Sequence, residues 1–160
     1  MKAWMSLPDF LQALPDQPVL VHLPQGRVLP IVCDSPHSGT AYPEDFGAVV
    51  PMSLLRRGED THVAALWDRW PEFGASLLEA TFPRTYIDPN RNESDLDPAQ
   101  IEGEWPVPLA PSVKTQQGLG LIWQRISKAG VATPLYERKR TVEEVQHRIA
   151  NYWRPYHVAL

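Results

Sequence analysis

Proline occupies 17 of the 160 positions of this chain. A proline ring fixes its own φ angle, removes a backbone donor and restricts the preceding residue. We therefore expect long ordered loops between the helices and strands. An apolar share of 43% and a charged share of 21% are ordinary for globular proteins, so these loops belong to a folded domain rather than to a disordered or fibrous chain.

Length and charge narrow the class of protein. A chain of 160 residues has the usual size of one domain, and we expect residues 1–160 to form a single domain. The net charge of -4 and the lack of a basic run argue against nucleic acid or an acidic membrane as a partner. No stretch approaches the roughly 18 apolar residues of a transmembrane helix. The single cysteine, Cys33, permits no intrachain disulfide and fits a cytoplasmic protein.

The hydrophobic pattern predicts alternating strands and helices. In chain order we expect a helix at 8–14, strands at 18–23 and 27–33, a helix at 60–70, strands at 75–81 and 84–88, and a helix from 141 onward. Residues 89–117 have several prolines and little periodicity, which predicts a long loop. The last helix begins with the capping-box spacing of Thr141 and Glu144 and is still in its apolar pattern at Leu160, as a truncated sequence would be.

Three polar clusters are candidates for a functional site. The stretch DSPHSG places His37 on a turn after an apolar strand, where imidazole can bind a metal or remain a solvated side chain. Glu59 and Asp60 precede a helix, so Asp60 is either a helix cap or an oxygen ligand, and Glu59 is an exposed charge in its simplest interpretation. In DPNR, Arg91 suits capture of a carboxylate, or else forms an ion pair with a nearby acid.

Four stretches in order and register carry a family resemblance. They are DSPHSG (34–39), RGEDTHVAALW (57–67), FPRTYIDPNR (82–91) and RIANYWRPYHVAL (148–160). Together they resemble the N-formylglutamate amidohydrolase family, over most of the chain from about residue 18. The resemblance implies an α/β fold of three αβα layers with a mixed, largely parallel sheet, similar to zinc carboxypeptidases and aspartoacylases, of which this chain is the N-terminal part.

The resemblance also implies a reaction and roles for residues. Members release formate from N-formyl-L-glutamate late in histidine degradation, with Zn²⁺ as cofactor and this small molecule as substrate. His37 and Asp60 match metal ligands, with Glu59 as the substitute for Asp60. Asn90 and Arg91 match the Asn-Arg pair that holds substrate, and Arg84 falls on a position that is often basic.

The chain departs from the family pattern in two places. Ala64 stands where the family usually has an aspartate. The family's second histidine motif, which supplies a third zinc ligand, and the glutamate that acts as general base are both expected beyond Leu160. His147 and His157 lie in the terminal helix and are not predicted as ligands.

Three hypotheses about function remain open at this point. The first is an N-formylglutamate amidohydrolase, and the second is a related hydrolase of another N-acyl amino acid. The third is a catalytically inactive fragment that lacks the third ligand and the base. The sequence leaves the oligomeric state open.

Overall fold

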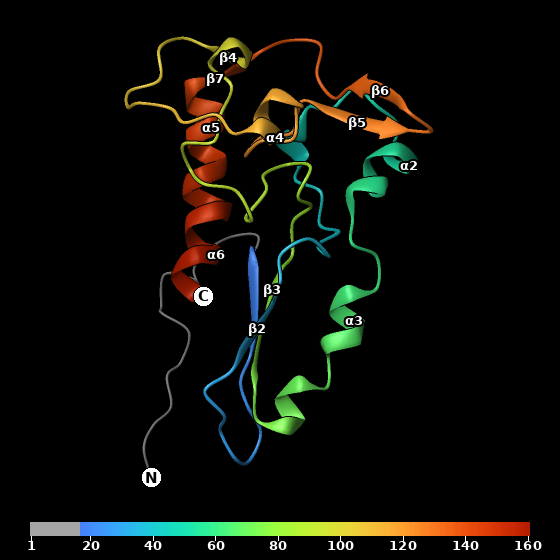
Figure 1. The fold of residues 1–160 in the computed structure, drawn as a ribbon, viewed down its shortest axis with the longest axis vertical. Helices are drawn as coiled ribbons and strands as arrows, with labels where there is room; N and C mark the ends of the chain where they lie inside the picture. The colour runs from blue at the N-terminus through green and yellow to red at the C-terminus, as the bar shows by residue number, and fades with distance from the viewer. Residues whose placement is uncertain (1–16) are drawn as a thin grey trace.

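The computed structural model describes residues 17–160. Its largest sheet has three strands in the order β1-β3-β2, namely Val19–His22, Ser76–Ala80 and Val32–Ser35. Strand β1 is antiparallel to β3, and β2 is parallel to it. A second, parallel pair joins β4 (Ile101–Glu102) to β7 (Arg140–Thr141), and a third, antiparallel pair joins β5 (Arg125–Lys128) to β6 (Val131–Pro134). The mixed α/β class is confirmed (Figure 1).

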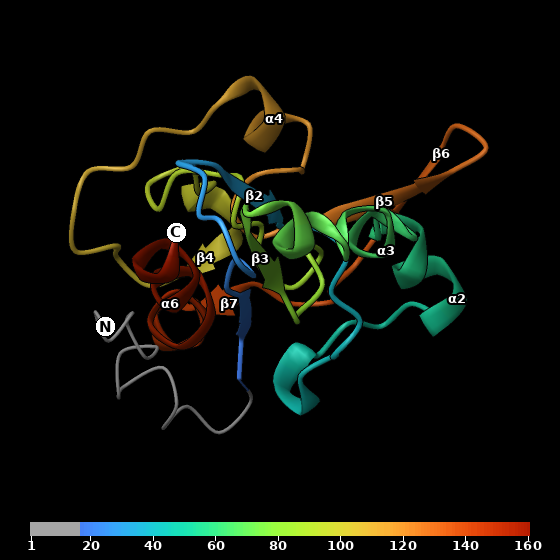
Figure 2. The same cartoon turned by 90° about the horizontal axis from the view of Figure 1, so that it is seen from below.

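The helices are short apart from one at the C-terminal end. They are α2 (Met52–Leu55), α3 (Val63–Trp67), α4 (Val113–Gln116), α5 (Val142–Arg148) and α6 (Arg154–Ala159), with a π-helical turn at Ile149–Trp153 that joins α5 to α6. Single 3₁₀ turns occur at Glu44–Phe46, Arg56–Gly58, Trp70–Phe73 and Pro98–Gln100. Figures 1 and 2 show the α5 to α6 helix on one side of the three-stranded sheet and α3 on the other. Within residues 17–160 no helix has the length and apolarity needed to cross a membrane.

The core forms between β3 and the C-terminal helix. Leu78 and Ala80 of β3 are buried, together with Tyr152 and Tyr156 from the helix. The Tyr152 ring meets the ring of Tyr86 edge to face at 5.0 Å, an arrangement that stabilises aromatic pairs beyond their buried area. The C-terminal helix therefore packs on β1 and on the residues that follow β3.

A buried guanidinium links this helix to the loops that follow β3. Arg148 is 1% exposed, and its Nη1 donates to the Tyr86 carbonyl and to the Tyr136 hydroxyl, each at 2.9 Å. Its Nη2 donates to the Phe46 carbonyl at 3.0 Å, and the guanidinium lies 4.0 Å from the centre of the Tyr86 ring. Burial of a charge is costly unless it is hydrogen-bonded, and these bonds to Nη1 and Nη2 tie the guanidinium to the backbone at Tyr86 and Phe46, whereas Nε has no hydrogen-bond partner among the described residues.

The strands differ from the prediction in several respects. Strand β2 begins at Val32 rather than at residue 27, and β1 and β2 both pair with β3. In β2, Val32 is exposed and Ser35 is buried. Residues 84–88 form a buried turn, with the Asp88 N–H donating to the Leu121 carbonyl at 2.8 Å, so the predicted strand there is wrong. The expected largely parallel sheet is not seen within residues 17–160, where half of the pairings are antiparallel.

The helix predicted at 60–70 is divided into α3 and the turn at Trp70–Phe73. The N-cap residue of α3 is His62, with φ of 68°. Asp60 does not cap this helix, because its side chain contacts His37 instead. Leu66 of α3 is 75% exposed. The helix predicted at 8–14 lies outside the described residues.

The long loop at 89–117 is ordered by a buried acid. Asp95 accepts from the backbone N–H of Ser112 at 2.6 Å and from the Ser112 hydroxyl at 2.9 Å, and the Thr115 hydroxyl also donates to it. These bonds hold the start of α4 against the loop. The segment also contains the turn at Pro98–Gln100, β4 and α4, which the hydrophobic pattern did not predict because each is only two to four residues long.

The predicted capping box of the last helix is present, and it makes stability depend on pH. The Glu144 carboxylate accepts from the Thr141 N–H at 2.7 Å, and Thr141 Oγ1 accepts from the Glu144 N–H at 3.3 Å. The hydrogen bond from Arg138 is the main factor that lowers the pKa of Glu144 to about 2. This folded-state pKa lies below the value of about 4.3 in an unfolded chain. The ionised carboxylate therefore stabilises the fold above pH 4.3, and this stabilisation is lost as the pH falls toward 2.

We expect Glu144→Gln to lower the free energy of unfolding at pH 7, and the difference from the parent protein to shrink as the pH falls from about 5 toward the folded pKa. Urea denaturation at several pH values measures this difference. As a control, Thr141→Ala removes the other half of the box without a change of charge and should cost about 1 kcal/mol at every pH. A Glu144→Gln difference that does not vary with pH would contradict the electrostatic explanation.

Candidate functional site

The loop that follows β2 carries His37 and lies against the end of β3. Gly39 permits this approach, because a Cβ atom at its position would lie 2.3 Å from the Phe82 carbonyl oxygen. The Asp60 N–H donates to the His37 carbonyl at 3.0 Å, and Ser38 Oγ donates to the Asp60 carbonyl at 3.0 Å. Backbone bonding thus holds His37 and Asp60 side by side.

The His37 imidazole lies between two carboxylates. Its Nδ1 is 3.2 Å from Asp60 Oδ2, and its Nε2 is 2.9 Å from Asp88 Oδ1. The Asp88 side chain is fully buried, whereas that of Asp60 is 46% exposed. One edge of the imidazole therefore faces the interior of the protein and the other faces the surface.

The Asp88 carboxylate collects donors from three parts of the chain. Its Oδ1 accepts from His37 and from the Asn90 N–H at 3.0 Å, and its Oδ2 accepts from Arg84 Nη2 at 3.0 Å and from Trp123 Nε1 at 3.3 Å. Burial alone would raise the pKa of Asp88. The hydrogen bond from His37, the charge of Arg84 and the Asn90 N–H outweigh burial and hold this pKa below its usual value. Asp88 is thus an ionised carboxylate, which only accepts hydrogen bonds.

The ionised Asp88 fixes the tautomer of His37. Because Asp88 has no proton to give, Nε2 of the imidazole must carry the proton of their hydrogen bond. In a neutral imidazole, Nδ1 is then an acceptor that faces the acceptor oxygen of Asp60. Two facing acceptors repel each other unless a proton or another positive charge lies between them.

The three predicted substrate residues lie around the same carboxylate. Besides its bond to Asp88, Arg84 places Nη1 3.7 Å from Asp60 Oδ1. Arg91 Nε lies 4.0 Å from Asp88 Oδ2 and donates to the Leu119 carbonyl at 3.2 Å. Asn90 is exposed and reaches Asp88 through its backbone N–H. The structure thus brings Arg84 and Arg91 to the cluster of His37, whereas the contact of Asn90 is made by its main chain.

Glu59 points away from this cluster. Its buried carboxylate accepts from the Tyr42 hydroxyl at 2.8 Å and from Arg56 Nε at 3.3 Å. Of the two neighbouring acids, Asp60 is the one in contact with His37. Within residues 17–160 no group of three or more His, Cys, Asp or Glu side chains is arranged to hold a metal ion.

The comparisons with known proteins place the chain in a family. A model of the N-formylglutamate amidohydrolase family matches residues 29–160. The chain belongs to this family. The resemblance found in the four sequence stretches is thereby confirmed.

Relatives of the chain in the N-formylglutamate amidohydrolase family are longer. An N-formylglutamate deformylase of Pseudomonas putida is 30% identical over 139 residues, which are 85% of this chain and 45% of the relative. One from Pseudomonas aeruginosa is 29% identical, over 83% of this chain and 44% of its own length. The crystal structure of an N-formylglutamate amidohydrolase from Ralstonia eutropha matches with a TM-score of 0.85 and 62% identity, over 89% of this chain and 50% of that one. The chain therefore spans about half the length of these relatives.

The four stretches that resemble the N-formylglutamate amidohydrolase family meet in the structure. His37 joins the first stretch to the second through Asp60 and to the third through Asp88. The last stretch contacts the others through the hydrogen bond from Arg148 to the Tyr86 carbonyl described above and through three further hydrogen bonds. These are Tyr156 Oη to Asp34 Oδ2 at 2.8 Å, Trp153 Nε1 to the Arg91 carbonyl at 2.9 Å, and His157 Nε2 to the Pro89 carbonyl at 2.9 Å. His157 thus has a packing role.

Two residues of this site were not predicted as part of it. Asp88 lies in the quoted DPNR stretch, but the chain contains 19 acidic residues and no local pattern marks this one as the partner of His37. Trp123 was not predicted for the site, yet its Nε1 donates to Asp88, and the Arg84 guanidinium lies over its ring at 5.0 Å from the ring centre. Ala64 stands where the family usually has an aspartate, and its backbone N–H donates to Ser38 Oγ at 3.2 Å.

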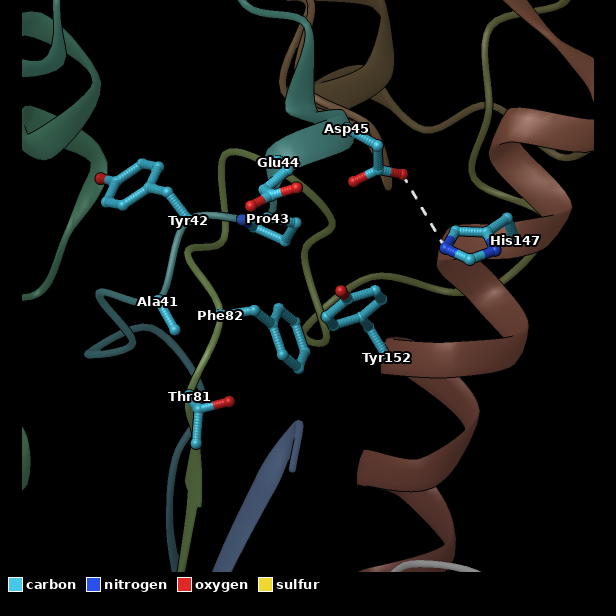
Figure 3. A pocket seen from close by; sticks show the side chains of 9 residues that line it. All are labelled: Ala41, Tyr42, Pro43, Glu44, Asp45, Thr81, Phe82, His147 and Tyr152. Atoms are coloured by element: carbon cyan, nitrogen blue, oxygen red, sulfur yellow. Dashed lines mark ion pairs between the residues drawn. The ribbon is translucent and has the colours of Figure 1, made fainter. Parts of the chain in front are cut away.

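A cavity of about 400 Å³ lies apart from this cluster, between β3 and α5 (Figure 3). Its lining consists of Ala41, Tyr42, Pro43, Glu44, Asp45, Thr81, Phe82, His147 and Tyr152. Figure 3 shows His147 directed from α5 toward Asp45, and 3.8 Å separate its Nε2 from Asp45 Oδ2. None of the six residues predicted for the site lines this cavity.

We expect Asp88→Asn to destabilise the protein strongly. The amide keeps the shape of the carboxylate but leaves buried donors of His37, Arg84 and Trp123 without a charged acceptor, and loss of one partner of a buried pair costs about 3–5 kcal/mol. Urea denaturation at pH 7 measures the change. The surface variant Asp68→Asn is the control and should stay within about 0.5 kcal/mol of the parent protein. Equal stability of the two variants would show that Asp88 does not organise the site.

Proposed function

We propose that this chain forms one half of a zinc-dependent N-formylglutamate amidohydrolase, which hydrolyses the formamide bond of N-formyl-L-glutamate. The observation that carries the proposal is the placement of His37 between Asp60 and Asp88, with Arg84 and Arg91 beside them. Membership of the family supports this substrate, and related N-acyl amino acids are the alternative substrate class.

The donor pair fits a zinc ion. Zinc binds imidazole nitrogen and carboxylate oxygen at about 2.0–2.2 Å, so two ligands of a tetrahedron lie about 3.3 Å apart. The separation of 3.2 Å between His37 Nδ1 and Asp60 Oδ2 agrees with this spacing. Asp88 on the opposite nitrogen corresponds to the carboxylate that orients a metal-binding histidine and raises its basicity. Glu59 does not fit, because Tyr42 and Arg56 hold it elsewhere.

His37 and Asp60 are two ligands, and catalytic zinc sites use three from protein. In this proposal the third ligand and the general base come from the polypeptide that corresponds to the unmatched half of the relatives. Together the two halves would form a fold of the zinc carboxypeptidase and aspartoacylase type. Residues 1–160 alone are then expected to bind zinc weakly and to show no turnover.

When bound, zinc polarises the formyl carbonyl and lowers the pKa of its water to about 7. The residues of this chain position the reactants. Asp88 keeps the proton of His37 on Nε2, so that Nδ1 keeps a free lone pair that points toward Asp60. The guanidinium groups of Arg84 and Arg91 are suited to bind the carboxylates of the substrate, because their forked donors match carboxylate oxygens.

Zinc binding tests the ligand assignment. We expect His37→Gln and Asp60→Asn each to weaken the affinity of the 160-residue protein for Zn²⁺ by about tenfold or more, measured by isothermal titration calorimetry. His147→Gln, which removes a half-exposed histidine remote from the site, is the matched control and should leave the affinity unchanged. Equal affinities for His37→Gln and His147→Gln would overturn the assignment.

Substrate selectivity tests the guanidinium assignment. We expect a chimera, in which residues 1–160 replace the matched half of the Ralstonia eutropha protein, to hydrolyse N-formyl-L-glutamate faster than N-formyl-L-glutamine. Arg91→Lys should reduce kcat/KM for N-formyl-L-glutamate by about 10- to 100-fold through loss of charged hydrogen bonds. The surface variant Arg69→Lys should match the parent chimera. An Arg91→Lys chimera with unaltered kinetics would remove Arg91 from the substrate site.

A further inference from the structure

The hairpin formed by residues 118–124 lies against the turn that carries Asp88. Leu119 and Trp123 form an antiparallel bridge across this hairpin. The Leu121 carbonyl, between them, accepts from the Asp88 N–H at 2.8 Å. The hairpin sequence GLGLIWQ has no charged residue, so it acts on the charged cluster through its carbonyls and through the indole of Trp123. We call this segment the 118–124 hairpin.

The 118–124 hairpin contacts both arginines that the proposed function assigns to the substrate. The Leu119 carbonyl accepts from Arg91 Nε at 3.2 Å. On the other strand of the hairpin, the centre of the Trp123 ring lies 5.0 Å from the guanidinium carbon of Arg84. An aromatic face attracts a cation that lies within about 6 Å of the ring centre. One short segment therefore orients two guanidinium groups.

Trp123 contacts both members of the ion pair of Arg84 and Asp88. Its Nε1 donates to Asp88 Oδ2 at 3.3 Å, and Arg84 Nη2 donates to the same oxygen at 3.0 Å. The indole therefore holds the carboxylate with its N–H and the guanidinium with its ring face. The ring is itself packed beside Gly58, where an added Cβ atom would lie 3.5 Å from Cζ3.

The hydrogen bond to Asp88 alone does not fix the plane of the Arg84 guanidinium. Nη1 lies 3.7 Å from Asp60 Oδ1, which is longer than a hydrogen bond, and the buried Nε has no hydrogen-bond partner among residues 17–160. A guanidinium held only at Nη2 can rotate about that bond, whereas the ring of Trp123 restrains its plane. Nη1 then stays on the side of Asp60, whose side chain is 46% exposed, and can donate to an incoming oxygen.

We propose that Trp123 is a positioning residue for substrate recognition: its indole holds Arg84 in the orientation in which Nη1 donates to a substrate carboxylate. The inference rests on the proposed function, which assigns Arg84 and Arg91 to the carboxylates of the substrate. A charged hydrogen bond is stronger than a neutral one, so a loosened Arg84 weakens binding of a carboxylate more than binding of a carboxamide in its place. The preference for a dicarboxylate therefore depends on Trp123, which acts through Arg84.

Kinetics of the chimera of residues 1–160 with the Ralstonia eutropha protein test this role on three substrates. N-formyl-L-glutamate has both carboxylates, N-formyl-L-glutamine lacks the γ-carboxylate, and N-formyl-L-isoglutamine lacks the α-carboxylate. We expect Trp123→Leu to raise KM for N-formyl-L-glutamate by about tenfold or more through loss of a charged hydrogen bond. The kcat should change by less than about threefold, because this interaction is shared by ground state and transition state. For the amide that lacks the carboxylate bound by Arg84, KM should change by less than about threefold.

Two matched variants separate the contributions of the ring and the N–H. Trp123→Phe keeps an aromatic face and removes the N–H, so it should keep KM for N-formyl-L-glutamate within about threefold of the parent chimera. Trp70→Phe changes a tryptophan whose ring pairs with that of Trp67 instead of with a guanidinium, and it should leave all three KM values unchanged. Circular dichroism of each variant checks that it folds, and Trp123→Met, which also lacks an aromatic ring, replaces Trp123→Leu if the latter does not.

The arginine side-chain NMR spectrum of the 160-residue protein gives a readout without turnover. A guanidinium that is held in place has separate Nη1 and Nη2 signals, whereas rotation about the Nε–Cζ bond averages them. We expect separate signals for Arg84, identified by their loss in Arg84→Lys, in the parent protein and in Trp123→Phe. In Trp123→Leu these signals should merge at the same temperature.

Three results would overturn the inference. One is a Trp123→Leu chimera with the KM of the parent for N-formyl-L-glutamate. Another is an equal rise of KM for all three substrates, which a general loss of structure would cause. The third is an Arg84 guanidinium whose signals are merged in the parent protein or remain separate in Trp123→Leu. A parent chimera that hydrolyses none of the substrates contradicts the proposed function, whereas the arginine spectrum still decides whether Trp123 holds Arg84.

Discussion

The buried carboxylate of Asp88 is the interaction on which the site depends. It receives an imidazole from the β2 loop, a guanidinium and a backbone N–H from its own turn, and an indole from Trp123. These donors come from segments far apart in the sequence, and the carboxylate is their common acceptor. Because the donors outweigh burial and keep the pKa of Asp88 low, the charge persists at neutral pH. The position and tautomer of His37 follow from that charge.

The C-terminal helix fixes the position of the turn that carries Asp88. Arg148 donates to the carbonyl of Tyr86, two residues before Asp88, and its charge is balanced by carbonyls, a hydroxyl and aromatic faces rather than by an acid. Hydrogen bonds from Trp153 and His157 reach the backbone at Arg91 and Pro89, on the other side of Asp88. The helix therefore holds the turn on both sides. These contacts are a physical reason why the stretches 82–91 and 148–160 occur together in the family resemblance.

Local sequence signals predicted the parts of the fold that depend on local interactions. The capping box of Thr141 and the apolar run of β3 were recognised, because each is determined by neighbouring residues. The turn at 84–88 was mistaken for a strand, since its apolar residues are buried by distant segments instead of by a sheet. Asp60 was open to two interpretations for the same reason: whether it caps a helix or contacts His37 depends on a loop 23 residues away. Asp88 carried no local signal at all.

Charge balance connects the metal to the substrate in the proposed function. Asp60 and Asp88 contribute two negative charges, and Arg84 and Arg91 contribute two positive charges, so the cluster is neutral when His37 carries one proton. A neutral cluster exerts little attraction on a dianion. A divalent cation between His37 and Asp60 would give the cluster two positive charges, which match the two carboxylates of N-formylglutamate. Metal and substrate would then bind cooperatively, because each supplies the charge that the other requires.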